Sequence, residues 1–86
     1  MSEFLLDVPP HLDKKFAKIA KKDKKQMEAI DKTVADVLEK PLHFKPLRGD
    51  KKGARRVHVW KAFVLLYQVN ENVVELLDYD HHDNIY

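Results

Sequence analysis

The amino-acid sequence predicts a small α+β domain, in which one strand and two helices precede a meander of strands. Three observations predict this fold. Two stretches with helical spacing of apolar residues occupy the first half, prolines and glycines interrupt residues 41–54, and three strand-like segments follow. Two such helices must cover one face of a sheet. We therefore expect one domain over residues 1–86, with the order β-α-α-β-β-β, an antiparallel sheet of about four strands, and the other sheet face free.

The first half of the chain contains the expected first strand and both helices. A short apolar segment over residues 3–8, closed by two prolines, predicts the strand. Helices are predicted over residues 10–21 and from Asp23, a suitable N-cap, to Lys40, which precedes a proline. Their apolar positions are Leu12, Phe16, Ile19 and Ala20 in the first helix, and Met27, Ile30, Val34 and Leu38 in the second. The tight connection between the helices predicts an antiparallel hairpin.

The second half predicts three strands joined by tight turns. They cover residues 55–60, 63–69 and 73–79, and residues 80–86 are expected to form a polar tail. The middle segment is too apolar for an exposed strand and therefore predicts a central strand, with Phe63 and Tyr67 in the core. In the first segment the side chains alternate between two faces, with Val57 and Val59 on one and Arg56, His58 and Trp60 on the other.

Composition narrows the classes of protein to which this chain can belong. The absence of cysteine excludes disulfides and thiolate metal sites, and it fits a reducing compartment. The longest apolar run, residues 62–67, is too short to span a bilayer, and no signal-peptide pattern is present. We therefore expect a soluble, cytoplasmic protein with no membrane partner.

Charge is distributed unevenly along the chain. Residues 43–61 contain seven Lys and Arg against one Asp, whereas residues 62–86 contain five acidic residues and no Lys or Arg. A basic block of this kind is a candidate binding surface for a polyanion. The alternative is a solvated loop without a partner.

The basic block contains a first group of candidate functional residues. Arg55, Arg56 and His58, taken together on one face, are suited to bind a phosphodiester and to move a proton. The upstream candidates for phosphate binding are Lys45, Arg48, Lys51 and Lys52. The alternative is a solvated sheet face without a function. Trp60 is a candidate for stacking on a base, and its alternative role is to cap the edge of the core.

The C-terminal segment holds a second group. His81 and His82 among three carboxylates suggest a metal site, but adjacent side chains are expected to point apart, so we predict neither a metal nor another cofactor. The alternative is that His82 transfers a proton and that Tyr86 supplies an aromatic ring or hydroxyl.

Two local sequences resemble the RelE/ParE superfamily of toxins. They are the Leu-Arg-Gly loop with the basic strand, within residues 46–59, and the Leu-Tyr-Gln-Val strand within residues 63–69. The ending, residues 79–86, is similar to the histidine-bearing, YafQ-like branch of RelE-type toxins. The resemblance implies a RelE-like fold and a ribosome-dependent endoribonuclease that needs no metal. In this chemistry the ribose 2′-hydroxyl attacks the adjacent phosphate and the 5′-oxygen leaves.

The resemblance also implies roles for individual residues. His82 would be the general base or acid, and His58 its complement or an electrostatic stabiliser. Arg56 would clamp the phosphate, Tyr86 would stack and orient, and Arg55 and Arg48 would contact phosphates. RelE carries a strand arginine at the position of Val64, so one of these three arginines would have to replace it.

Partners and competing functions follow from the same resemblance. It implies a cognate antitoxin, with which the toxin forms a hetero-oligomer, and it implies the ribosome and mRNA as targets. The basic surface predicts an acidic antitoxin segment. Two alternatives stay open: a ParE-like inhibitor of DNA gyrase, and an inactive relative that only binds RNA or protein.

Overall fold

The computed structural model describes residues 4–44, 46 and 53–85. Its elements are β1 (Leu5–Asp7), α1 (Pro10–Lys22), α2 (Lys24–Glu39), β2 (Ala54–Trp60), β3 (Phe63–Asn70), β4 (Val73–His81) and α3 (His82–Ile85). The predicted order is confirmed, with α3 as an addition at the end. Within the part of the chain that is described, no helix has the length and apolar character to cross a membrane.

The four strands form one sheet in the order β1-β4-β3-β2. The meander β2-β3-β4 is antiparallel as predicted, whereas β1 lies parallel to β4, with Leu5 opposite Val73 and Asp7 opposite Glu75. The sheet is therefore mixed, and the expectation of a wholly antiparallel sheet is wrong for its first strand. The apolar pattern of a short strand does not encode its direction. A helical crossover is the usual way to bring a strand parallel to its neighbour.

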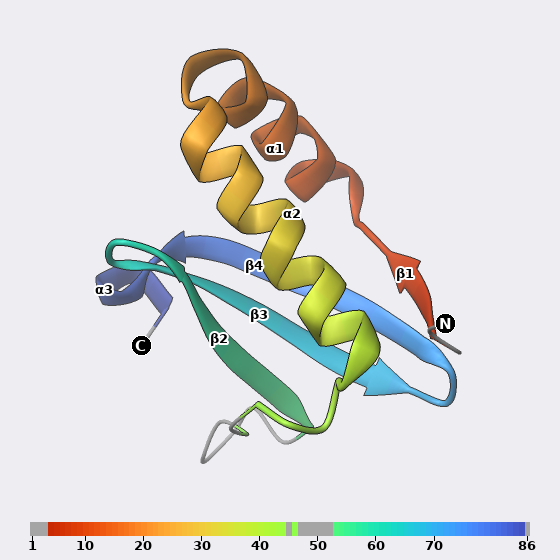
Figure 1. Ribbon diagram of the computed structural model, residues 1–86. Helices are drawn as coiled ribbons and strands as arrows, with labels where there is room; N and C mark the ends of the chain where they lie inside the picture. Colours follow the sequence, from red (N-terminus) through yellow and green to blue (C-terminus); the bar gives the residue numbers. More distant parts are fainter. Residues whose placement is uncertain (1–3, 45, 47–52, 86) are drawn as a thin grey trace.

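Helices α1 and α2 cover one face of the sheet, as Figure 1 shows. Asp23 separates them and satisfies backbone groups of both. Its N–H donates to the Ile19 carbonyl at 2.7 Å, and its side chain accepts the Gln26 N–H at 3.1 Å. The predicted N-cap is therefore confirmed, and the two helices form the expected hairpin.

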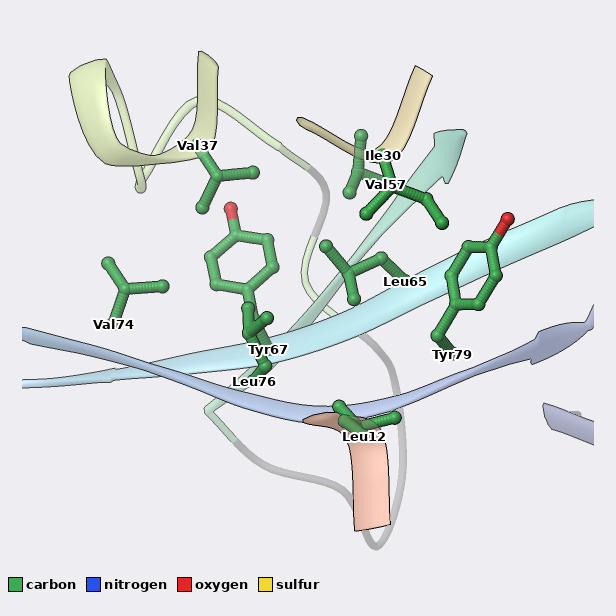
Figure 2. Close-up of a cluster of buried hydrophobic side chains, with 9 residues drawn as sticks. All are labelled: Leu12, Ile30, Val37, Val57, Leu65, Tyr67, Val74, Leu76 and Tyr79. Carbon is green, nitrogen blue, oxygen red and sulfur yellow. The ribbon is translucent and has the colours of Figure 1, made fainter. Parts of the chain in front are cut away.

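The main core lies between these helices and the sheet (Figure 2). Its buried members are Leu12, Ile30, Val37, Val57, Leu65, Tyr67, Val74, Leu76 and Tyr79. Both tyrosine hydroxyls have partners, because Tyr79 donates to Gln26 Oε1 at 2.7 Å and Tyr67 donates to the Pro41 carbonyl. Burial raises the pKa of Tyr67 to about 12 and also raises that of Tyr79. The two tyrosines thus hold both ends of α2 onto the sheet.

The opposite face of the sheet, here called the outer face, carries a second and smaller apolar cluster. Val64 and Leu66 alternate with the core residues of β3, and they pack with Ile85 of α3. The expectation that this face is free is therefore wrong at one end, where α3 covers it.

Candidate functional site

A cavity of about 830 Å³ lies along the edge strand β2. It is lined by His43, Phe44, Arg56, Val57, His58, Val64 and His82. These residues come from three parts of the chain: the segment after α2, the β2-β3 hairpin, and the start of α3. In Figure 1 the segment after α2 leads toward the start of β2, and α3 lies near the β2-β3 turn.

Strand β2 supplies Arg56 and His58 to this cavity. The two residues are separated by one position, so they share a face, and both are exposed. Their cross-strand neighbours in β3 are Leu66 and Val64 respectively. Val64 lines the cavity and is only 4% exposed. The cavity therefore has an apolar wall at this position and carries its positive charge on Arg56.

The end of the chain brings His82 to the same cavity. Strand β4 continues to His81, opposite Phe63, and α3 follows at once. The His82 N–H donates to the Ala62 carbonyl at 2.8 Å, which attaches α3 to the β2-β3 turn, and Ile85 is buried on the outer face. The expectation of a polar tail over residues 80–86 is wrong for the described residues 80–85, because pairing with β3 extends β4 to His81 and the next four residues form α3.

Asp80 stabilises the junction between β4 and α3. Its Oδ1 accepts the His81 N–H at 2.7 Å and the Asn84 side-chain amide at 3.2 Å. The backbone N–H of His81, and then the Asn84 amide, lower the pKa of this carboxyl. The junction that orients His82 is thus held by an ionised carboxylate.

The environment of the His82 ring distinguishes its two nitrogens. Nδ1 lies 3.0 Å from Asp83 Oδ1. A carboxylate at this nitrogen favours the tautomer with the proton on Nδ1, which leaves a lone pair on Nε2. Nε2 is therefore the nitrogen suited to accept a proton from a bound molecule.

His43 and Phe44 were not identified from the sequence, because they lie in a segment interpreted only as a loop. The structure holds this segment from the helix-covered side. Besides the Tyr67–Pro41 hydrogen bond, Arg55 Nη1 donates to the Phe44 carbonyl at 2.6 Å. The Phe44 ring makes edge contacts with the rings of His43 and Tyr67, at centroid distances of 5.2 Å and 6.4 Å. A histidine next to an aromatic residue, between two prolines and before a basic run, was the available signal.

Two predicted residues are not among the described residues that line the cavity. Arg55 alternates with Arg56 and lies on the helix-covered side, near Tyr67, so the expectation that both arginines share a face with His58 is wrong. A β-bulge after His58 pairs Trp60 with Phe63, and the Trp60 ring lies 5.6 Å from Lys61 Nζ. The predicted residues Lys45, Arg48, Lys51, Lys52 and Tyr86 lie outside the described residues.

The cavity thus joins side chains suited to one class of chemistry. Imidazoles are the side chains that exchange protons near neutral pH. A guanidinium offers a planar fork of donors that matches phosphate oxygens. Three histidines and an arginine around one cavity can bind a phosphodiester and move protons to and from it.

Comparison with known proteins identifies the family. The model of the ParE toxin of the type II toxin–antitoxin system parDE matches residues 7–86. The chain belongs to the RelE/ParE superfamily of toxins. The "Putative toxin RelE4" of Methanocaldococcus jannaschii is 43% identical over 83 residues, covering 94% of this chain and 88% of the relative.

Solved structures share the fold of this RelE/ParE-type chain. The YoeB/ParE toxin from Agrobacterium tumefaciens superposes with a TM-score of 0.82 at 17% identity, covering 92% of this chain and 99% of that one. The YoeB–YefM complex from Staphylococcus aureus gives a TM-score of 0.77 at 13% identity, covering 92% and 97%. The E. coli toxin RelE in the free state also shares the fold, with a TM-score of 0.77 at 23% identity, covering 98% and 87%, so the predicted RelE-like architecture is confirmed.

Proposed function

We propose that this chain is a ribosome-dependent endoribonuclease toxin that cuts translated mRNA and so inhibits translation. The observation that carries this proposal is the cavity along β2, where Arg56 lies with His43, His58 and His82. Membership of a toxin family supports the biological setting, and the imidazoles support the chemistry.

In the proposed reaction, Nε2 of His82 accepts the proton of a ribose 2′-hydroxyl as that oxygen attacks the adjacent phosphorus. His58 donates a proton to the 5′-oxygen as the bond between phosphorus and that oxygen breaks. Arg56 stabilises the negative charge of the phosphorane. The products are a 2′,3′-cyclic phosphate on one fragment and a 5′-hydroxyl on the other, and no metal ion takes part.

We assign supporting roles to the other predicted residues. Lys45, Arg48, Lys51 and Lys52 contact the RNA backbone, and Tyr86 orients the substrate. Phe44 and His43 offer rings at the edge of the cavity on which an exposed base can stack. Arg55 positions Phe44 rather than contacting the reacting phosphate, because its guanidinium is bonded to the Phe44 carbonyl.

An antitoxin partner belongs to the same proposal. One chain of the solved YoeB–YefM complex has the same fold as this protein. A partner that neutralises this toxin would bind the basic residues 43–61 with an acidic segment. The affinity of this association would fall as the salt concentration increases. Association that is indifferent to salt would contradict this electrostatic view.

The experiment uses a cell-free translation reaction with a defined message, in which new RNA ends are mapped. We expect wild-type protein to cut only translated message and to leave 2′,3′-cyclic phosphate ends. His58→Gln and His82→Gln should each lower the cleavage rate by about 10²- to 10⁴-fold, since each removes one proton-transfer group. His11→Gln is the matched control, because His11 is an exposed histidine on α1 that is not among the residues lining the cavity.

Two outcomes would contradict the nuclease. One is the absence of cleavage by folded wild-type protein. The other is cleavage that persists when the attacking nucleotide lacks its 2′-hydroxyl, because the proposed nucleophile would then be missing.

A ParE-like inhibitor of DNA gyrase is the second candidate function. It is favoured by the parDE description of the matching family model. The apolar Val64 in the wall of the cavity, at the position of the RelE strand arginine, favours instead an inactive relative that only binds RNA or protein. Loss of gyrase supercoiling activity in the presence of the purified protein, without cleavage of RNA, would select this function. A protein inactive in both assays would be a binding-only relative.

A further inference from the structure

The junction between β4 and α3 brings three potential metal ligands together. His81 is the last residue of β4 and His82 the first of α3, and this change of backbone direction stacks the two imidazole rings. Their centroids are 4.8 Å apart and their planes differ by 29°. The expectation that these adjacent side chains point apart, which argued against a metal site, is therefore wrong.

Both rings direct a nitrogen at the same carboxylate. His82 Nδ1 lies 3.0 Å from Asp83 Oδ1, and His81 Nδ1 lies 3.5 Å from Asp83 Oδ2. Two ligands of one tetrahedral zinc ion, each bound at about 2.0–2.2 Å, are separated by roughly 3.4 Å. One potential ligand atom from each of the three residues lies within 4.8 Å of the others. The spacing of the free side chains is thus already close to that of a metal-bound set.

Two further features suit this group to an ion. The Asp83 N–H donates to His81 Nδ1 at 3.3 Å, so this nitrogen presents the lone pair that a metal ion requires. The side chains of His81, His82 and Asp83 are 39%, 48% and 71% exposed, which allows an ion to enter and leaves room for water as a further ligand.

From this geometry we infer that His81, His82 and Asp83 bind Zn²⁺ or a similar divalent transition-metal ion, and that the ion inhibits the adjacent cavity. Two imidazoles and one carboxylate suit such ions, whereas Mg²⁺ prefers oxygen ligands. An ion on Nδ1 of His82 leaves the ring proton on Nε2, so the ring loses the lone pair that accepts the 2′-hydroxyl proton. The inhibitory part of this inference rests on the proposed function, and the binding part does not.

Titration calorimetry of the untagged full chain with ZnCl₂ tests the binding part. We expect one ion per chain, no matching heat from MgCl₂, and at least tenfold weaker zinc binding in His81→Ala and in Asp83→Asn. His11→Ala is the control for chance binding by an exposed histidine, and it should bind as wild type does. Equal affinity of wild type, His81→Ala and Asp83→Asn would overturn the site, as would an equal loss in His11→Ala.

Cleavage of translated message at increasing ZnCl₂ tests the inhibitory part. Wild type should lose activity over the concentrations at which calorimetry shows binding. His81→Ala should retain basal cleavage, because His81 is not among the residues lining the cavity, and should need at least tenfold more zinc for inhibition. Equal inhibition of both proteins would overturn the regulatory part. If wild type does not cleave at all, the proposed nuclease fails, while calorimetry still decides the metal site.

Discussion

The two faces of the sheet differ in what they contain. Among the described residues, the helix-covered face holds a cluster of nine buried residues, and its tyrosine hydroxyls are hydrogen-bonded. In the same part of the chain, the outer face holds a buried cluster of three residues, and beside it Arg56, His58 and His82 line a cavity. Strand β2 takes part in both, because its successive side chains alternate between the faces. Strand β2 thus contributes to the core through Val57 and to the candidate site through Arg56 and His58.

This difference indicates that stability and activity can be changed separately. Substitutions on the helix-covered face should lower the free energy of unfolding, whereas those of exposed residues at the cavity should lower cleavage. The connection between the faces is local. It consists of the segment after α2 and the junction before α3, where core residues position residues of the cavity.

The largest effect on stability is expected at Leu65, and it should exceed the effect at the adjacent Leu66. Leu65 packs in the nine-residue cluster and Leu66 in the smaller one, and both are buried. Leu65→Ala should cost about 4 kcal/mol, because helices and sheet enclose the space it leaves, and Leu66→Ala about 2 kcal/mol, because α3 can close on the smaller cluster. Urea unfolding of the two variants measures both values. Equal losses would show that the outer cluster is as important to folding as the main core.

A second effect on stability should appear at alkaline pH, and it should come from a tyrosine on the helix-covered face. Tyr67 has its pKa raised from 10.0 to about 12, so folding favours the protonated phenol. The contribution of Tyr67 to the free energy of unfolding is fully present below pH 10, where the folded and unfolded states both keep the phenol protonated. It falls as pH rises from 10 to 12, because there the unfolded state releases the proton while the folded state keeps it. The loss assigned to Tyr67 is about 2–3 kcal/mol. Denaturation of wild type and Tyr67→Phe between pH 9 and about 12 measures it. A fall of equal size in the variant would contradict this assignment.

The fold could be predicted from the sequence because apolar spacing and turn residues recur at each element. Asp23 marked the helical boundary, and the uninterrupted apolar segment from Phe63 marked the central strand. The direction of β1 could not be predicted, since a three-residue strand with exposed side chains has no pattern that distinguishes the two directions of pairing.

The candidate site was predictable only where neighbours in sequence are also neighbours in space. Arg56 and His58 follow from strand alternation. His43 reaches the cavity through contacts of Tyr67 and Arg55 with its segment, so its position depends on tertiary contacts, and the local sequence gives only a weak signal: a histidine and an aromatic residue between two prolines. The stacking of His81 on His82 depends on a change from strand to helix, which charge and hydropathy did not indicate.

The connection between the faces can be tested with two tyrosine hydroxyls. Tyr67→Phe leaves the Pro41 carbonyl without its partner and should cost about 1–2 kcal/mol. It should also lower cleavage several-fold, because the segment carrying His43 loses an anchor. Tyr79→Phe is the matched control, since its partner is Gln26 of α2, away from the cavity. Urea unfolding and the cleavage assay are measured on both. Equal activity of the two variants would show that the segment is held without Tyr67.

The smallest effect should come from Asp80, at the junction before α3. Asp80→Asn retains an oxygen that can accept the His81 N–H but removes the charge, and at pH 7 it should cost a few tenths of a kcal/mol, because solvent screens this carboxylate. The pKa of Asp80 is lowered by folding, so its contribution is present above the unfolded value of 3.8 and disappears as pH falls below it. Wild type and variant should therefore become equally stable in acid. A difference that persists there would mean that the substitution changes the packing of α3, and cleavage by the variant would then fall together with its stability.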